Sequence, residues 1–164
     1  VRMFALETPM SPHLAAFPVC RSHDLFHPLE AYPAELRRNP ADEVYWLKWD
    51  STNHGETIVR VARLGSKAMT TRLHQTSRFG KRRCAQASLA MSDWRKVEEA
   101  VAIVGFWHLA ERGGGMGCDG ADWLIAGRRR FDYHLVRRWS PDGALHDFGR
   151  LLFDLAGLSD FRLY

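Results

Sequence analysis

Short alternating segments separated by tight-turn residues constrain the fold of this chain more than any other feature. ETIVRVARL places Val59 and Val61 on one face of an extended strand and Arg60 and Ala62 on the other. A Gly-Ser pair follows, as in a tight turn between strands. The same pattern predicts a meander of four strands: EVYWLKWD, ETIVRVARL, KAMTTRLHQ and CAQASLAMS, at residues 43–50, 56–64, 67–75 and 84–92.

A helix is predicted directly after the meander. Ser92 is placed as its N-cap, and Asp93 lies where the positive end of a helix favours an acid. Gly105 ends the helix. Apolar residues at a 3-4-3 spacing share one face of it: Trp94, Val97, Val101 and Val104.

A second hairpin and a final helix complete the pattern. ADWLIAG and FDYHLVRRW read as strands, with a turn at Gly127–Arg130 between them. SPDG is a further tight turn, and the helix after it ends near Gly157. The apolar stripe of this helix is Leu145, Phe148, Leu151, Leu152 and Leu155.

Four strands, a helix, two strands and a helix predict an α+β fold rather than a doubly wound sheet. We expect a single antiparallel sheet of about six strands, with helices packed on one face and the other face partly open. The 164 residues allow one domain. We place that domain at residues 41–164, after an irregular Pro-rich N-terminal arm at residues 1–40 in which a helix fits only near 29–38.

Basic residues concentrate in two segments. Residues 57–92 hold eight Lys or Arg and no Asp or Glu, and residues 128–138 hold five Arg and one Asp, although the net charge is only +4. One interpretation is a surface for phosphates, nucleic acid or an acidic protein. The other is that exposed strands carry Lys and Arg for solubility and edge protection, which is the commoner reason for a charge run.

The second hairpin is the candidate binding site. Asp132, His134 and Arg138 share one face of its second strand, so the histidine and the arginine would flank a bound anion while the aspartate orients the imidazole. The alternative, which we favour, is a surface pair of Asp132 and Arg138 beside a half-buried histidine. Three arginines crowd a turn that cannot bury them, and an acidic partner would relieve their repulsion. The candidate binding residues are Arg128, Arg129, Arg130, His134, Arg137 and Arg138.

The sequence predicts no metal, cofactor or catalytic residue. CRSHDLFH offers Cys20, His23, Asp24 and His27, but the glutamate of a zinc-binding HExxH helix is absent and Pro28 restricts a helix there. The glycine-rich ERGGGMGCDG lacks the GK[ST] of a phosphate-binding loop. No GxSxG nucleophile elbow is present.

Cysteine usage and hydropathy bear on location. Three distant cysteines without a CxxC argue against a disulfide framework and favour a reducing compartment, so we expect a cytoplasmic protein. The N-terminal segment is interrupted by Glu7 and three prolines, unlike a signal peptide. No apolar run approaches the roughly 20 residues that cross a bilayer, so no membrane is expected as a partner.

The C-terminal half resembles that of a group of small bacterial proteins of unknown function. GCDGADWLIAG, FDYHLVRRWSPDG and LLFDLAGL are similar to their pattern of GLDG-x-x-W-x-L-E-G, Y-H-V-V-D-R-W-S-P and a helix ending in L-x-G-L. The resemblance implies a fold and a bacterial source but no activity. Ala126 and Arg137 depart from the pattern, which has acids there. The matching positions are Asp119, Gly120, Trp123, Gly127, Tyr133, His134, Arg138, Trp139, Ser140 and Pro141.

Together these observations favour a non-catalytic interaction protein over an enzyme. We expect an adaptor- or immunity-like protein that uses a basic sheet face against an acidic protein partner or another polyanion. One alternative is an enzyme or binder acting on an anionic small molecule near His134. Another is a nucleic-acid-associated protein whose basic strands and aromatic side chains form a stacking platform, although no RNP-like motif is present.

Overall fold

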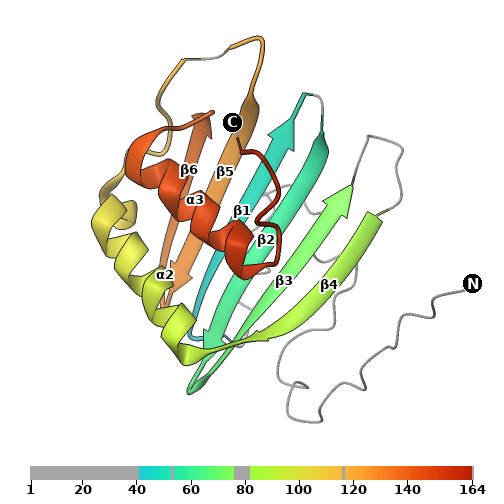
Figure 1. Ribbon diagram of the computed structural model, residues 1–164. Helices are drawn as coiled ribbons and strands as arrows, with labels where there is room; N and C mark the ends of the chain where they lie inside the picture. The colour runs from blue at the N-terminus through green and yellow to red at the C-terminus, as the bar shows by residue number, and fades with distance from the viewer. Residues whose placement is uncertain (1–40, 53, 76–81, 116, 164) are drawn as a thin grey trace, which may run out of the picture.

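One antiparallel sheet organises the computed structural model, which describes residues 41–52, 54–75, 82–115 and 117–163 (Figure 1). Its six strands lie in the order β4-β3-β2-β1-β5-β6. The predicted α+β fold with a single sheet is therefore confirmed. The strands are β1 (Glu43–Ser51), β2 (Gly55–Leu64), β3 (Lys67–Gln75), β4 (Arg82–Leu89), β5 (Ala121–Arg129) and β6 (Asp132–Trp139).

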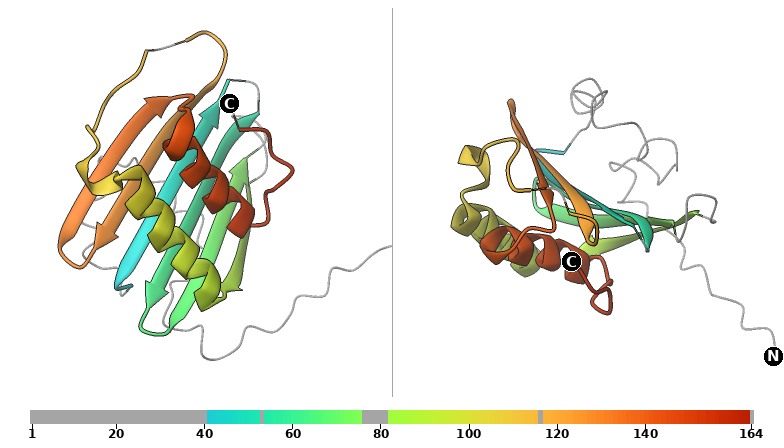
Figure 2. Two further views of the ribbon diagram at one scale, coloured as in Figure 1. Left: turned by 60° about the vertical axis from the view of Figure 1, so that its left-hand side comes forward. Right: turned by 90° about the horizontal axis from the view of Figure 1, so that it is seen from above.

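The helices α2 (Met91–Val104) and α3 (Gly143–Leu155) lie side by side across one face of the sheet, and the short 3-10 helix η3 (Phe106–His108) follows α2 (Figure 2). The main core fills the space between this helix layer and the sheet. The apolar face predicted for α2 is buried there through Trp94, Val97 and Val101. The largest of the fully buried side chains include Tyr45, Trp49, Trp123, Phe148 and Phe153.

The far face of the sheet carries a second, smaller apolar cluster. Within each strand, successive side chains point to opposite faces of the sheet, as the sequence predicts. Val59 and Val61 of β2 therefore join the main core, and Ala62 joins the second cluster. Arg60 is also buried on this face, with its guanidinium over the ring of Trp46 at 5.7 Å from the centroid. The second cluster consists of Ala41, Val44, Trp46, Ala62, Met69 and Ala126.

The start of α2 differs from the prediction. The helix begins at Met91, its N-cap is Ala90 without a side-chain hydrogen bond, and Ser92 lies inside the first turn. The reason is that β4 ends at Leu89, so the chain turns from strand to helix within one residue. Asp93 remains in the first turn, and Gly105 ends the helix with a φ of 62°, both as expected.

The turn of the second hairpin is also shifted from its predicted place. β5 continues to Arg129, which pairs with Asp132, so the turn is Arg130-Phe131 rather than Gly127–Arg130. Gly127 instead serves packing inside the strand. A Cβ atom there would lie 2.6 Å from the ring of Phe106 and 2.9 Å from that of Tyr45.

Several sequence expectations concern residues outside the described part of the chain. These are the irregular arm, the helix near 29–38 and the CRSHDLFH segment, all within residues 1–40. Among the cysteines, Cys118 is a free, exposed thiol, whereas Cys84 on β4 is disulfide-bonded, which the sparse cysteine pattern did not predict. No helix in the described ranges is long and apolar enough to cross a membrane.

Candidate functional site

The structure does not gather the six candidate residues on one surface. Because neighbouring residues of a strand point to opposite faces, the six divide between the helix side, the far side and the turn. Arg129, His134 and Arg138 lie on the helix side, Arg128 and Arg137 on the far side, and Arg130 in the turn.

The far-side arginines already have partners within the chain. Arg137 forms an ion pair with Asp122: Nη2 lies 2.8 Å from Oδ2, and Nε lies 3.0 Å from each of the two carboxylate oxygens. Arg128 donates to the carbonyls of Ala41 and, at 3.2 Å, of Arg130. The repulsion expected among five guanidinium groups is therefore largely relieved on this side. Asp122 on β5 supplies a diagonal partner for Arg137, which stands where the resembled pattern has an acid.

Within the long basic segment, the described arginines of β2 and β3 do not form an open basic face either. Arg60 is buried, Arg63 is ion-paired, and Arg72 donates to the carbonyls of Ala156 and Gly157 at 3.0 and 2.9 Å. Those carbonyls follow the C-terminus of α3, where a cation is favourable. The arginines of β2 and β3 thus hold the fold together rather than line an open surface.

Arg138 and His134 have separate roles on the helix side. Arg138 donates to the carbonyls of Ala110 and Arg137 at 2.8 and 2.7 Å, so it holds the connector that precedes β5. The surface pair expected between Asp132 and Arg138 does not form, and Asp132 does not hydrogen-bond to the imidazole. His134 is half-buried, and its ring meets that of Phe106 edge-on at 5.3 Å.

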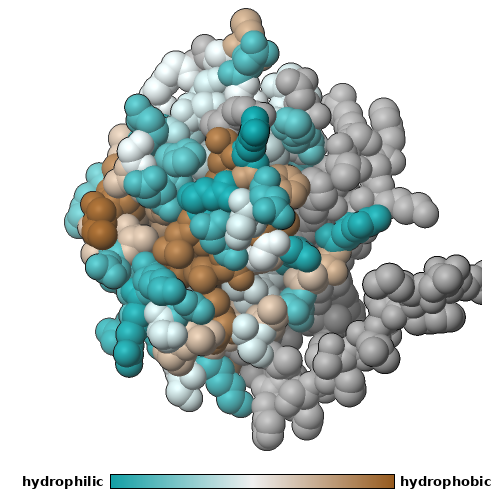
Figure 3. All heavy atoms as spheres, in the orientation of Figure 1, coloured by the Kyte–Doolittle hydropathy of each residue, from teal (hydrophilic) through white to brown (hydrophobic). Residues whose placement is uncertain are grey.

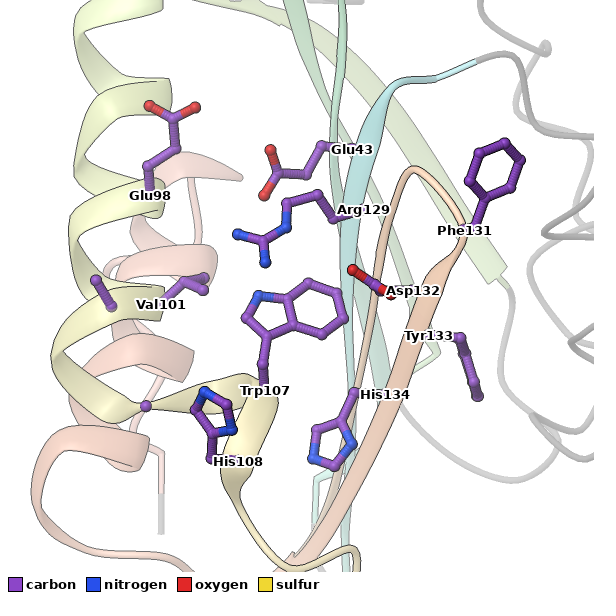
Figure 4. A pocket seen from close by; sticks show the side chains of 12 residues that line it. Glu43, Glu98, Val101, Trp107, His108, Arg129, Phe131, Asp132, Tyr133 and His134 are labelled. Carbon is purple, nitrogen blue, oxygen red and sulfur yellow. The ribbon is translucent and has the colours of Figure 1, made fainter.

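An open pocket of about 950 Å³ lies between α2, η3 and the β5–β6 hairpin (Figure 4). Figure 4 shows Trp107 at its centre, with Arg129 beside it and His134 and His108 below. The guanidinium of Arg129 lies over the Trp107 ring at 5.0 Å. The pocket is lined by Glu43, Glu98, Val101, Ala102, Gly105, Trp107, His108, Arg129, Phe131, Asp132, Tyr133 and His134.

A buried carboxylate forms one wall of this pocket. The side chain of Glu43 is only 7% exposed; it accepts a hydrogen bond from the Tyr45 hydroxyl at 2.5 Å and pairs with Arg63 at 3.4 Å. Burial raises the pKa of Tyr45 above its ordinary value, and the hydrogen bond to Glu43 and the charge of that carboxylate raise it further. The Glu43 carboxylate therefore already accepts from Tyr45 and is already paired with Arg63.

Sequence reasoning missed Glu43, Trp107 and Arg63. The sequence did contain a signal for Glu43. In EVYWLKWD this acid lies on the same face of the strand as Tyr45 and Trp49, which point into the core. A charged residue at an inward-facing position is unusual unless it is paired. No comparable signal marks Trp107, because the segment FWHL that contains it is apolar and matches no motif.

A second cavity of about 870 Å³ opens beside the first, at the end of the sheet. Arg63 is shared there between Asp42 and Glu43, at 3.6 and 3.4 Å. Its lining is Ala41, Asp42, Glu43, Arg63, Arg128, Arg129, Arg130, Phe131 and Asp132, so the hairpin turn separates the two cavities.

The turn itself projects into solvent. Phe131 is 101% exposed, and Figure 4 shows its ring pointing away from the pocket. Arg130 has a φ of 55°, and its side chain makes no hydrogen bond or ion pair with any described residue. On the helix side, by contrast, apolar surface lies in patches over and between α2 and α3, among polar side chains (Figure 3).

No protein-family model matches the chain, and a search of curated proteins finds no match either. The resemblance of residues 90–158 to small bacterial proteins therefore stays a prediction. In the ranges that the structure describes, no group of three His, Cys, Asp or Glu side chains gathers as a metal site.

Proposed function

We propose that this protein is a non-catalytic interaction protein, adaptor- or immunity-like, that holds an acidic partner protein at the β5–β6 turn. The observation that carries the proposal is Phe131, a fully exposed aromatic side chain at the tip of a tight turn. Leaving a phenylalanine in water forgoes about 1.5–3 kcal/mol of burial. Aromatic residues and arginine dominate the binding energy of protein interfaces.

The backbone beneath Phe131 supports the same reading. Arg130 occupies the left-handed region, which costs a residue with a side chain about 1–2 kcal/mol. Glycine, asparagine or aspartate would form this turn at lower cost. Unfavourable backbone conformations persist where a particular side chain is needed at a particular place. A guanidinium beside an exposed ring meets that description.

Charge identifies the class of partner. Around the turn, the Arg130 side chain has no partner among the described residues, and the guanidinium of Arg129 lies over the Trp107 ring. The nearby carboxylates of Asp42 and Glu43 are already paired with Arg63, and Asp132 is the cross-strand neighbour of Arg129, so the uncompensated charge is that of Arg130. The positive charge left over favours an acidic segment, because arginine binds carboxylates through two parallel hydrogen bonds.

The experiment begins with capture of the partner from the native host and continues with purified components. We expect Phe131→Ala to weaken partner affinity more than about tenfold, as hot-spot truncations do. Arg130→Ala slows association and flattens its salt dependence. Ile103→Ala, which removes another exposed apolar side chain on α2, serves as the matched control and leaves affinity within about twofold.

Two results would overturn the proposal. The first is partner affinity, with its salt dependence, that stays unchanged in both Phe131→Ala and Arg130→Ala. The second is Arg130-dependent binding of generic DNA or RNA instead of a protein, which would place the chain among nucleic-acid-associated proteins.

We further propose a cytoplasmic location, from the sparse cysteines. The disulfide at Cys84 argues the other way, because structural disulfides persist mainly in oxidising compartments. Alkylation of thiols in intact host cells distinguishes a reducing cytoplasm from an oxidising compartment. Modification of Cys84 along with Cys118 supports the cytoplasm, whereas protection of Cys84 until reductant is added contradicts it.

A further inference from the structure

We propose that the pocket between α2, η3 and the β5–β6 hairpin binds a free α-amino acid with an apolar side chain. The first support is a set of polar groups that lack partners. The imidazole Nε2 of His134 is a buried atom with no hydrogen bond to any described residue, and the indole Nε1 of Trp107, which lies near the Tyr45 hydroxyl, is buried without a hydrogen bond of good geometry to one. The Arg129 side chain likewise donates no hydrogen bond to a described acceptor; its guanidinium lies over the Trp107 ring and its charge acts on the Tyr45 hydroxyl. Buried polar groups are almost always bonded, so this pocket calls for an acceptor from outside.

The acids of the pocket do not fill that need. Glu43 is engaged by Tyr45 and Arg63, and Glu98 accepts the indole hydrogen bond of Trp94 at 2.9 Å. A ligand carboxylate is the acceptor that suits a guanidinium and an adjacent indole N–H. In Figure 4, Arg129 and Trp107 lie together in the middle of the pocket, where both would meet one carboxylate.

A simple anion, however, fits the pocket poorly. Three carboxylates line it, those of Glu43, Glu98 and Asp132, against the single guanidinium of Arg129. Asp132 is exposed and is the cross-strand partner of Arg129, so their side chains are neighbours on the same face. An ammonium on the carbon next to the bound carboxylate would meet Asp132. A zwitterion therefore satisfies both charges, where a monoanion satisfies one and is repelled by the other.

The rest of the lining indicates the side chain. Val101 and Ala102 of α2 and Gly105 form an apolar wall next to the Trp107 ring. An aliphatic or aromatic side chain would pack there and lose contact with water. These features do not depend on the exposed ring of Phe131 or on a protein partner, so the inference stands apart from the proposed function.

The test is a titration of the ¹⁵N-labelled protein with L-phenylalanine, followed through the indole N–H signal of Trp107. That signal is identified by its loss in Trp107→Phe. We expect a saturable shift with a dissociation constant in the millimolar range or tighter. 3-Phenylpropionate, which lacks the ammonium, and phenethylamine, which lacks the carboxylate, should each bind at least about tenfold more weakly, the effect of losing one charged contact.

Variants assign the two charges. Arg129→Gln should abolish the shift, and Asp132→Asn should reduce the affinity for L-phenylalanine to that for 3-phenylpropionate. Arg130→Gln, one residue further and outside the pocket lining, is the control and should bind as wild type does. If Arg129→Gln is unfolded, as loss of its dispersed NMR spectrum would show, Arg129→Lys replaces it in the test. The lysine variant keeps the positive charge but lacks the paired donors of the guanidinium.

The inference is overturned by any of three results. These are the absence of a saturable shift at Trp107, unchanged binding in a folded Arg129 variant, and 3-phenylpropionate binding as tightly as L-phenylalanine. Partner binding through Phe131 would be untouched by all three, so failure here and failure of the proposed function are distinguishable.

Discussion

Arg130 adopts a backbone conformation that is unfavourable for a residue with a side chain. Its φ of 55° belongs to the region that glycine adopts freely, and its side chain extends into solvent without a partner among the described residues. Its backbone is well used, because its N–H donates to Asp42 and its carbonyl accepts from Arg128. The turn is therefore held by the backbone, and the Arg130 side chain is not needed to form it.

Replacing this residue by glycine should stabilise the protein. Arg130→Gly removes the cost of the left-handed conformation, about 1–2 kcal/mol, while the added chain entropy of glycine offsets about 0.5–1 kcal/mol. We expect the free energy of unfolding, measured by chemical denaturation, to rise by up to about 1 kcal/mol. Arg130→Ala removes the same charge without relieving the backbone and should show no such gain. A loss of stability in Arg130→Gly would contradict the inference that the backbone of Arg130 is strained.

Tyr45 is the second residue with a consequence of its own. Tyr45→Phe leaves the buried Glu43 without its shortest hydrogen bond and should cost about 1–3 kcal/mol at neutral pH. The pKa of the folded-state hydroxyl is raised, while that of an unfolded tyrosine is about 10. The contribution of Tyr45 is therefore complete below about pH 10 and declines as the pH rises further.

Urea denaturation of wild type and Tyr45→Phe at pH 7, 10 and 11 checks this. The difference in unfolding free energy should shrink between pH 10 and 11. Tyr133, whose pKa is also raised by burial, is present in both proteins and cancels. A difference that stays constant with pH would mean that the hydroxyl is not held protonated by the fold.

Single elements explain where sequence reasoning succeeds and where it fails. β3 was predicted at its observed bounds because KAMTTRLHQ follows a Gly-Ser turn, although Ala68 and Met69 are buried on opposite faces of the strand. Gly127 was assigned to a turn, since glycine is a common turn residue. It lies instead where the rings of Phe106 and Tyr45 leave no room for a side chain. A glycine kept for close packing and a glycine kept for a turn look alike in one sequence.

Gly149 in α3 is a further glycine kept for packing. A Cβ atom there would lie 2.0 Å from the Trp123 ring, so Gly149→Ala gains about 1 kcal/mol of helix propensity but must displace a buried indole. We expect a net loss of about 1–3 kcal/mol in chemical denaturation. In a Trp123→Phe background, which lacks the contacting part of the ring, the same change should cost less. Equal costs in both backgrounds would exclude the clash.

Leu152 tests the apolar stripe of the same helix. It is fully buried between α3 and the sheet, so Leu152→Ala should lower the free energy of unfolding by about 2–5 kcal/mol. Asp147→Asn, on the exposed side of α3, is the control and should stay within about 0.5 kcal/mol of wild type. A leucine variant as stable as this control would mean that the stripe does not face the core.

At the scale of the whole molecule, the architecture was predictable and the site was not. Periodicity identified six strands and two helices because each element repeats its own pattern locally. The pocket joins Glu43 at the start of β1, Trp107 in η3 and Arg129 at the end of β5. They meet only because β5 pairs with β1, and no local pattern specifies that pairing. The hairpin stays a predicted site, singled out by its charge. Which of its arginines are paired depends on Asp122, Ala41 and Ala110, which are distant in the chain or on another strand.

The central position of β1 also affects how the protein is made. Sixty-nine residues separate the end of β1 at Ser51 from the start of β5 at Ala121, the strand that covers the second edge of β1. At about 5–20 residues per second, the ribosome delivers β5 roughly 4–14 seconds after β1. During that interval the nascent chain presents an open strand edge rich in tryptophan, which is a template for aggregation. Chaperone protection should matter most while residues 52–120 are being synthesised.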